Sequence, residues 1–152
     1  MGKQKLVEYF EEVETTQEYN GYFCSMPEAI SIVVLGSLCG LRNISQIHQW
    51  AESDKVAEFL KEKFGIEHIP CYYWLLSLLK MVKPGSLNKC LINWAATMLP
   101  ADRAGLTISL DGKTIRSTGK MESYDSPLHI ISAQISELGI TFASKSVDGN
   151  YK

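Results

Sequence analysis

Hydrophobic residues recur at helical spacing from the N-terminus to about residue 99. An amphipathic helix is predicted for residues 3–16, because glutamates occupy most positions outside its hydrophobic stripe. That stripe consists of Leu6, Val7, Phe10 and Val13.

A second predicted helix, from Ser25 to about Cys39, is apolar on almost every side. Ser25 suits the cap, Pro27 the first turn, and Glu28 the reciprocal position of a capping box. A helix that is apolar all round is typical of the centre of a bundle.

Caps and breakers delimit the remaining helices. They are predicted to begin after Asn43, to run from Ser53 to a stop at Gly65, to cover Cys71 to Val82, and to run from Pro84 to a point before Pro100. The three tryptophans fall on hydrophobic stripes and are predicted to anchor the core: Trp50, Trp74 and Trp94.

Beyond residues 100–105 the period changes from helical to alternating, which predicts strands at about 106–111, 128–136 and 140–147. Asp111 is expected to end the first strand, with Gly112 as a turn. We therefore predict an α+β protein with a helical domain at 1–99 and a second domain at 100–152. Three strands alone leave one face and two edges uncovered, which favours self-association.

Composition excludes few functions. The net charge of −2 and the pI near 5.9 give no general attraction to nucleic acid, although residues 108–121 hold three basic side chains against one acidic. The acidic N-terminus lacks an apolar segment of the kind found in signal peptides, and no apolar run is long enough to span a membrane. A cytoplasmic protein without a membrane partner is expected, and its four cysteines are predicted to be buried and reduced.

Asp111 and the basic residues after it are the candidates for chemistry. A carboxylate at a strand end suits metal binding or acid–base catalysis, but Asp-Gly is also an ordinary turn. Lys113 and Arg116 could contact phosphates or could simply lie in a solvated loop. Ser109 and Ser132 fall in predicted strands without an evident activating partner.

Two motifs carry a family resemblance: Ile108-Ser109-Leu110-Asp111-Gly112-Lys113-Thr114-Ile115-Arg116 and His129-Ile130-Ile131-Ser132-Ala133. Gly40-Leu41-Arg42-Asn43-Ile44 and Asn93-Trp94 precede them in a matching order. From about residue 26 to its end, the chain resembles the N-terminal part of transposases of the ISAs1 family, which includes the H-repeat-associated proteins.

The resemblance implies that residues 1–99 precede a catalytic core and that residues 106–147 form the first three strands of an RNase H-like fold. Asp111 matches the first carboxylate of a D-D-E triad, which holds Mg²⁺ or Mn²⁺ for DNA cleavage and strand transfer. Lys113, Arg116 and Lys120 are expected to contact DNA at transposon ends. A bacterial, nucleoid-associated location follows from the same resemblance.

The chain also departs from the family pattern. The second Asp and the Glu of the triad are absent, and Asp148 lies too close to the third predicted strand to replace them. We expect a truncated transposase that binds metal weakly and does not catalyse by itself. The alternatives are a non-catalytic helical module that contacts DNA or a full-length transposase, and an interaction domain that never meets DNA.

Overall fold

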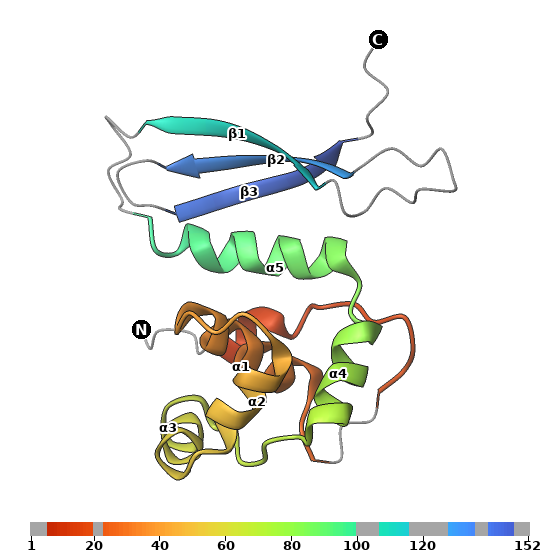
Figure 1. Ribbon diagram of the computed structural model, residues 1–152, viewed down its shortest axis with the longest axis vertical. Helices are drawn as coiled ribbons and strands as arrows, with labels where there is room; N and C mark the ends of the chain where they lie inside the picture. Colours follow the sequence, from red (N-terminus) through yellow and green to blue (C-terminus); the bar gives the residue numbers. More distant parts are fainter. Residues whose placement is uncertain (1–5, 20–22, 100–106, 116–127, 136–139, 148–152) are drawn as a thin grey trace. The chain divides into compact units, whose positions relative to one another are not determined.

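The computed structural model describes residues 6–19, 23–99, 107–115, 128–135 and 140–147. Helices come first and an antiparallel sheet follows, which confirms the α+β class (Figure 1). The chain divides into two compact units, Met1–Leu91 and Ile92–Lys152. The predicted boundary segment, residues 100–105, lies outside the described residues, so a division at 99/100 stays a prediction.

The helical part consists of a short 3₁₀ helix and five α-helices among the described residues. These are η1 (Leu6–Phe10), α1 (Met26–Leu38), α2 (Ile44–Glu52), α3 (Asp54–Phe64), α4 (Tyr72–Met81) and α5 (Pro84–Ala96). The division between the two units falls inside α5. The helix predicted for residues 3–16 is wrong beyond Phe10, because Glu14 to Thr16 pair with a distant segment instead.

Local capping signals are realised closely. At the start of α1, Ser25 Oγ accepts a hydrogen bond from the Glu28 N–H, and Glu28 Oε2 accepts one from the Ser25 N–H. Gly65 ends α3 in the left-handed conformation, with φ of 75°. Asn43 caps α2 through Gln46, but the Gln46 side chain accepts from the N–H of Arg42 rather than that of Asn43.

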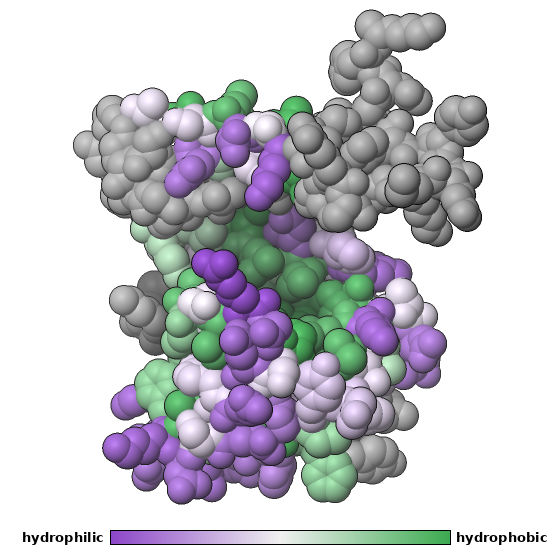
Figure 2. All heavy atoms as spheres, in the orientation of Figure 1, coloured by the Kyte–Doolittle hydropathy of each residue, from purple (hydrophilic) through white to green (hydrophobic). Residues whose placement is uncertain are grey.

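Helix α1 lies at the centre of the helical unit, as its apolar sequence predicted. It contacts η1, α2 and α4. The largest fully buried hydrophobic side chains of the helical unit are Phe10, Ile30, Ile32, Leu60, Ile66, Leu75 and Leu78. The buried hydroxyl of Ser31 donates to the carbonyl oxygen of Pro27 at 2.8 Å, so this polar group is satisfied. By contrast, the side chains over α3 are mainly hydrophilic (Figure 2).

The sheet has three strands, β1 (Ile108–Ile115), β2 (Leu128–Ile135) and β3 (Ile140–Val147), in the order β1-β2-β3 with both pairs antiparallel. The predicted turn at Gly112 is wrong, because β1 continues through Gly112, which pairs with Ile131. Glycine weakens a strand without ending it when the ladder continues on both sides. Asp111 therefore lies within β1 rather than at its end.

Candidate functional site

One face of the β1–β2 ladder holds two of the four predicted site residues, Asp111 and Lys113. Side chains alternate along a strand, and residues directly opposite each other in a ladder share a face. Ser109, Asp111 and Lys113 therefore share one face of β1. Their partners on β2 are Gln134, Ser132 and Ile130, in that order. Over the three rungs from Ser109 to Lys113, this face is polar apart from Ile130.

Asp111 and Lys113 are both exposed on this face. Alternate residues of a strand lie about 7 Å apart, so the carboxylate and the ammonium group can approach the same solute. Arg116 and Lys120, the other two residues predicted to bind DNA, lie outside the described residues. Of the three basic residues predicted to bind DNA, the structure therefore places Lys113 on the same face as Asp111.

The opposite face of the same ladder is apolar from Ile108 to Gly112. Ile108 and Leu110 on β1 are 58% and 73% exposed, and Ile131 on β2 is 46% exposed. The alternation that puts Asp111 on one face requires these side chains on the other. From Ile108 to Lys113, the two faces of β1 and of its paired positions on β2 therefore differ in polarity.

The fit of a divalent cation to this face depends on its oxygen ligands. Within the described ranges, no group of three or more His, Cys, Asp or Glu side chains is placed to hold a metal ion. Mg²⁺ prefers about six oxygen ligands, and Asp111 offers one carboxylate of the right chemistry. The described residues on this face are therefore too few in carboxylates to hold such an ion by themselves.

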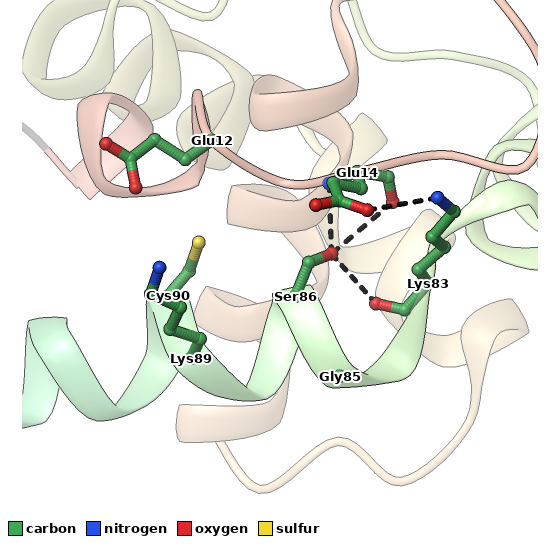
Figure 3. A pocket seen from close by; sticks show the side chains of 7 residues that line it. All are labelled: Glu12, Glu14, Lys83, Gly85, Ser86, Lys89 and Cys90. Carbon is green, nitrogen blue, oxygen red and sulfur yellow. Dashed lines mark hydrogen bonds and ion pairs between the residues drawn. The ribbon is translucent and has the colours of Figure 1, made fainter.

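A second arrangement of polar groups ties the N-terminal segment to the start of α5 (Figure 3). The Thr16 N–H donates to the Met81 carbonyl at 2.7 Å, and the Lys83 N–H donates to the Glu14 carbonyl at 2.9 Å. The Glu14 N–H donates to Ser86 Oγ at 2.9 Å, and Lys83 Nζ lies 3.0 Å from Glu14 Oε2. We call this pairing of residues 14–16 with residues 81–86 the clasp.

A hollow of about 470 Å³ lies beside the clasp. Its lining, drawn in Figure 3, is Glu12, Glu14, Lys83, Gly85, Ser86, Lys89 and Cys90. The pKa of the Cys90 thiol is raised by burial and by Glu12, although Lys89 opposes the shift. A thiol that stays protonated is a poor nucleophile, so the hollow lacks an activated group for covalent chemistry. The clasp is best understood as structural.

Aromatic side chains gather on the surface around the start of α4. Phe23 is 72% exposed, Tyr73 78% and Trp74 42%, so the prediction that Trp74 anchors the core is wrong. Contacts between rings connect this aromatic surface to neighbouring side chains. They join Phe23 to His68, Tyr19 to Trp74, and Tyr72 to Tyr73 and His48.

The four cysteines differ in burial. All are free thiols; Cys24 and Cys90 are buried, whereas Cys39 and Cys71 are exposed. The prediction of buried cysteines is therefore wrong for two of them. Burial, reinforced by Glu28, raises the pKa of Cys24 to about 12.

Comparison with known proteins identifies the helical part. Residues 7–95, more than half of the chain, match the DDE_Tnp_1-associated family. The chain belongs to this family. Over 109 residues it is 27% identical to the Escherichia coli (strain K12) protein named "H repeat-associated putative transposase YhhI". The resemblance to transposases drawn from the sequence motifs is thereby confirmed.

The match covers 68% of this chain and 28% of the Escherichia coli relative, so the chain spans less than a third of that protein. No solved structure is significantly similar. No helix within the described ranges is long and apolar enough to cross a membrane.

The sequence predicted Asp111 and Lys113 as site residues, but it did not predict which residues lie across the ladder from this face. Ser132 lies directly across the ladder from Asp111, and Gln134 lies across from Ser109. The register that joins these pairs depends on the length and path of the intervening loop, which no local pattern encodes. The motif His129-Ile130-Ile131-Ser132-Ala133 was the signal that could have pointed to Ser132. Only the register of the strands shows that Ser132 lies across from Asp111.

Proposed function

We propose that this chain is the N-terminal part of a DDE transposase that acts in the transposition of an insertion sequence. Membership of the DDE_Tnp_1-associated family supports a role in transposition. The observation that carries the finer proposal is Asp111, an exposed carboxylate on the first strand of an antiparallel sheet that follows the family domain. In this proposal the sheet begins an RNase H-like core, in the cytoplasm of a bacterium with access to the nucleoid.

Asp111 would contribute one carboxylate to a bound Mg²⁺ or Mn²⁺. With its full ligand set, such a metal would supply the Lewis acidity that activates water, and then a 3′-hydroxyl, toward a DNA phosphodiester. Lys113 shares the face of Asp111 and would neutralise a phosphate of the DNA, with Arg116 and Lys120 proposed for the same role.

The chain by itself is proposed to be inactive in strand transfer. A metal pair needs several oxygen ligands, and no group of three or more His, Cys, Asp or Glu side chains in the described ranges could hold a metal ion. We expect no metal-dependent cleavage when the purified chain is mixed with DNA and Mg²⁺ or Mn²⁺. Robust cleavage that is lost in Asp111→Asn would refute the requirement for further carboxylates.

The nucleotides after the Lys152 codon provide a test of the fragment proposal. When these nucleotides are translated in each of the three reading frames, one frame should encode a strand that carries a second Asp, followed by a Glu. Unrelated sequence in all three frames would count against the proposal and would favour a stand-alone module.

The aromatic surface supports a second candidate function, a non-catalytic module that binds a full-length transposase. Residues 17–28 and 66–79, which supply most of this surface, contain three glutamates and no lysine or arginine. Residues 6–19 and 23–91 together hold seven basic and eleven acidic side chains, a net charge of −4. Exposed aromatics with this charge suit a protein partner better than a phosphate backbone.

Binding to the immobilised Escherichia coli relative, measured by surface plasmon resonance, would test this second candidate. Replacement of Phe23 and Tyr73 by alanine should weaken binding by about tenfold or more, because exposed aromatics dominate such interfaces. Phe59→Ala is the matched control, since Phe59 is 45% exposed on α3. Equal binding by both variants, or no binding by the unaltered chain, would contradict this function.

A further inference from the structure

The segment that precedes α1 lies beside the start of α4, and contacts between aromatic rings join the two (Figure 1). The ring centroids of Tyr19 and Trp74 are 6.0 Å apart, and those of Phe23 and His68 are 6.2 Å apart. The Tyr19 hydroxyl donates to the Cys24 carbonyl oxygen at 2.7 Å, which fixes the Tyr19 ring. The aromatic surface is therefore held in place before a partner arrives, and this lowers the entropic cost of binding.

Carboxylates accompany the rings of this surface. Burial is the main cause of the raised pKa of Tyr19, and Glu28 adds to it, so this carboxylate lies within electrostatic range of the Tyr19 ring. The exposed Glu67 immediately precedes His68, whose ring contacts that of Phe23. Acidic groups therefore lie close to both pairs of rings that join the two segments.

A third carboxylate is connected to the surface through two ring contacts. Glu52 Oε2 lies 3.3 Å from His48 Nδ1, and the ring centroids of His48 and Tyr72 are 6.3 Å apart. The Tyr72 ring in turn contacts that of the exposed Tyr73, with centroids 5.3 Å apart. The exposed rings thus combine with negative charge at several points of the surface.

The two segments that form this surface carry no fixed positive charge. Residues 17–28 and 66–79 contain three glutamates and no lysine or arginine. A cation is attracted both by the faces of Trp and Tyr rings and by carboxylates, whereas a phosphate is repelled by the carboxylates. Arginine suits such a surface best, because its planar guanidinium group stacks on aromatic faces and pairs with carboxylates.

We propose that the aromatic surface binds an arginine-rich segment of a partner protein. The guanidinium groups of this segment lie against the exposed rings of Tyr73 and Trp74 and pair with carboxylates such as Glu67. The proposal rests on the second candidate function, a module that binds a protein partner, and it names the chemistry of the segment that is bound.

Isothermal titration calorimetry of the full chain with synthetic peptides tests this chemistry. The first peptide alternates arginine with serine, and the second replaces each arginine by citrulline, which has a similar shape but no charge. The arginine peptide should bind at least about tenfold more tightly than the citrulline peptide, because cation–π and ionic contacts are lost together. Its affinity should fall as salt is added, since exposed charges are then screened.

Four variants of the chain locate the binding surface. Tyr73→Leu keeps an apolar side chain but removes the ring, and it should weaken binding of the arginine peptide about two- to fivefold. Phe59→Leu makes the same kind of change at a 45% exposed position on α3 and should leave binding unchanged. Glu67→Gln should weaken binding about twofold. Glu62→Gln on α3 alters the net charge equally and should have no effect.

Three results would overturn the proposal. Equal affinity for the arginine and citrulline peptides would show that the surface takes an apolar partner. Equal weakening by Tyr73→Leu and Phe59→Leu would show that the peptide binds without using this surface. If the arginine peptide does not bind and Tyr73→Leu abolishes self-association in analytical ultracentrifugation, the surface contacts a second copy of the chain.

Competition separates this proposal from the function on which it rests. An excess of the arginine peptide should displace the chain from the immobilised Escherichia coli relative, and the citrulline peptide should not. If the relative binds the chain but the arginine peptide fails to displace it, the proposed chemistry is wrong and the second candidate function stands. If the arginine peptide binds through Tyr73 and the relative does not bind, the chemistry stands and that function fails.

Discussion

Gly36 of α1 packs directly against Ile47 of α2. A Cβ atom at Gly36 would lie 2.9 Å from both Cγ1 and Cγ2 of the buried Ile47 side chain. Real Cβ atoms do not approach other heavy atoms this closely. The absence of a side chain at Gly36 therefore permits the close contact between the first two α-helices.

Gly36→Ala should consequently destabilise the helical unit. We expect a loss of about 1–3 kcal/mol in the free energy of unfolding, because overpacking forces a buried side chain or a helix to move. Urea unfolding followed by circular dichroism measures it. Gly85→Ala is the control, since a Cβ at Gly85 on α5 meets nothing within 4 Å. Alanine should leave stability there unchanged or raise it slightly; equal destabilisation by both would contradict the packing argument.

The clasp predicts unequal effects for two neighbouring residues. Ser86→Ala removes the acceptor of the Glu14 N–H and should cost about 1 kcal/mol of stability. Lys83→Ala removes an ion pair whose side chains are 50% and 65% exposed, and it should cost less than about 0.5 kcal/mol. Chemical denaturation of the two variants compares them. A larger loss for Lys83→Ala would show that the ion pair, not the hydroxyl, holds the clasp.

Burial predicts the order in which the thiols react. Cys39 and Cys71 should be alkylated by iodoacetamide at neutral pH, whereas Cys24 and Cys90 should react only after unfolding. Two causes slow the buried thiols. The reagent cannot reach them in the folded chain, and burial raises the pKa of Cys24 and of Cys90, so less of the reactive thiolate forms. Mass spectrometry of peptides after timed labelling measures each rate. Rapid labelling of Cys24 in the folded chain would be inconsistent with its burial.

Cys24 also predicts a pH dependence of stability. Its pKa is about 12 in the folded chain against an ordinary value of 9.0, so the folded state holds the proton more tightly. The stability linked to this proton is fully present below pH 9 and is lost as the pH rises toward 12. The free energy of unfolding should fall less steeply over this interval in Cys24→Ala. Identical slopes for the two chains would contradict the shift.

Local signals in the sequence predicted the helix ends well. Ser25 and Glu28 form their capping box because both partners lie within one turn of the helix. The segment after Phe10 was mispredicted because its partner, residues 81–83, lies far away in the sequence. Its amphipathic pattern favours a helix, but backbone pairing with the distant segment prevails.

The candidate site was predictable in part for the same reason. Asp111 and Lys113 could be predicted to share a strand because they belong to one short motif with an alternating pattern; their role as site residues stays a prediction. The place of Asp111 within its strand could not be predicted, because Gly112 reads locally as a turn and only the β1–β2 ladder extends the strand. The burial of Trp74 was mispredicted because a helical stripe of hydrophobic residues does not show which of them another element covers.

The clasp has a consequence for the order in which the helical unit can form. Ser86 and Lys83 lie 72 and 69 residues after Glu14 in the chain. During synthesis, the N-terminal segment leaves the ribosome long before the residues that pair with it. Helices α1 to α3 can form and pack in the interval, but residues 14–16 have no partner until the start of α5 emerges. Formation of the clasp is therefore a late folding step, which joins residues 14–16 to residues 81–86.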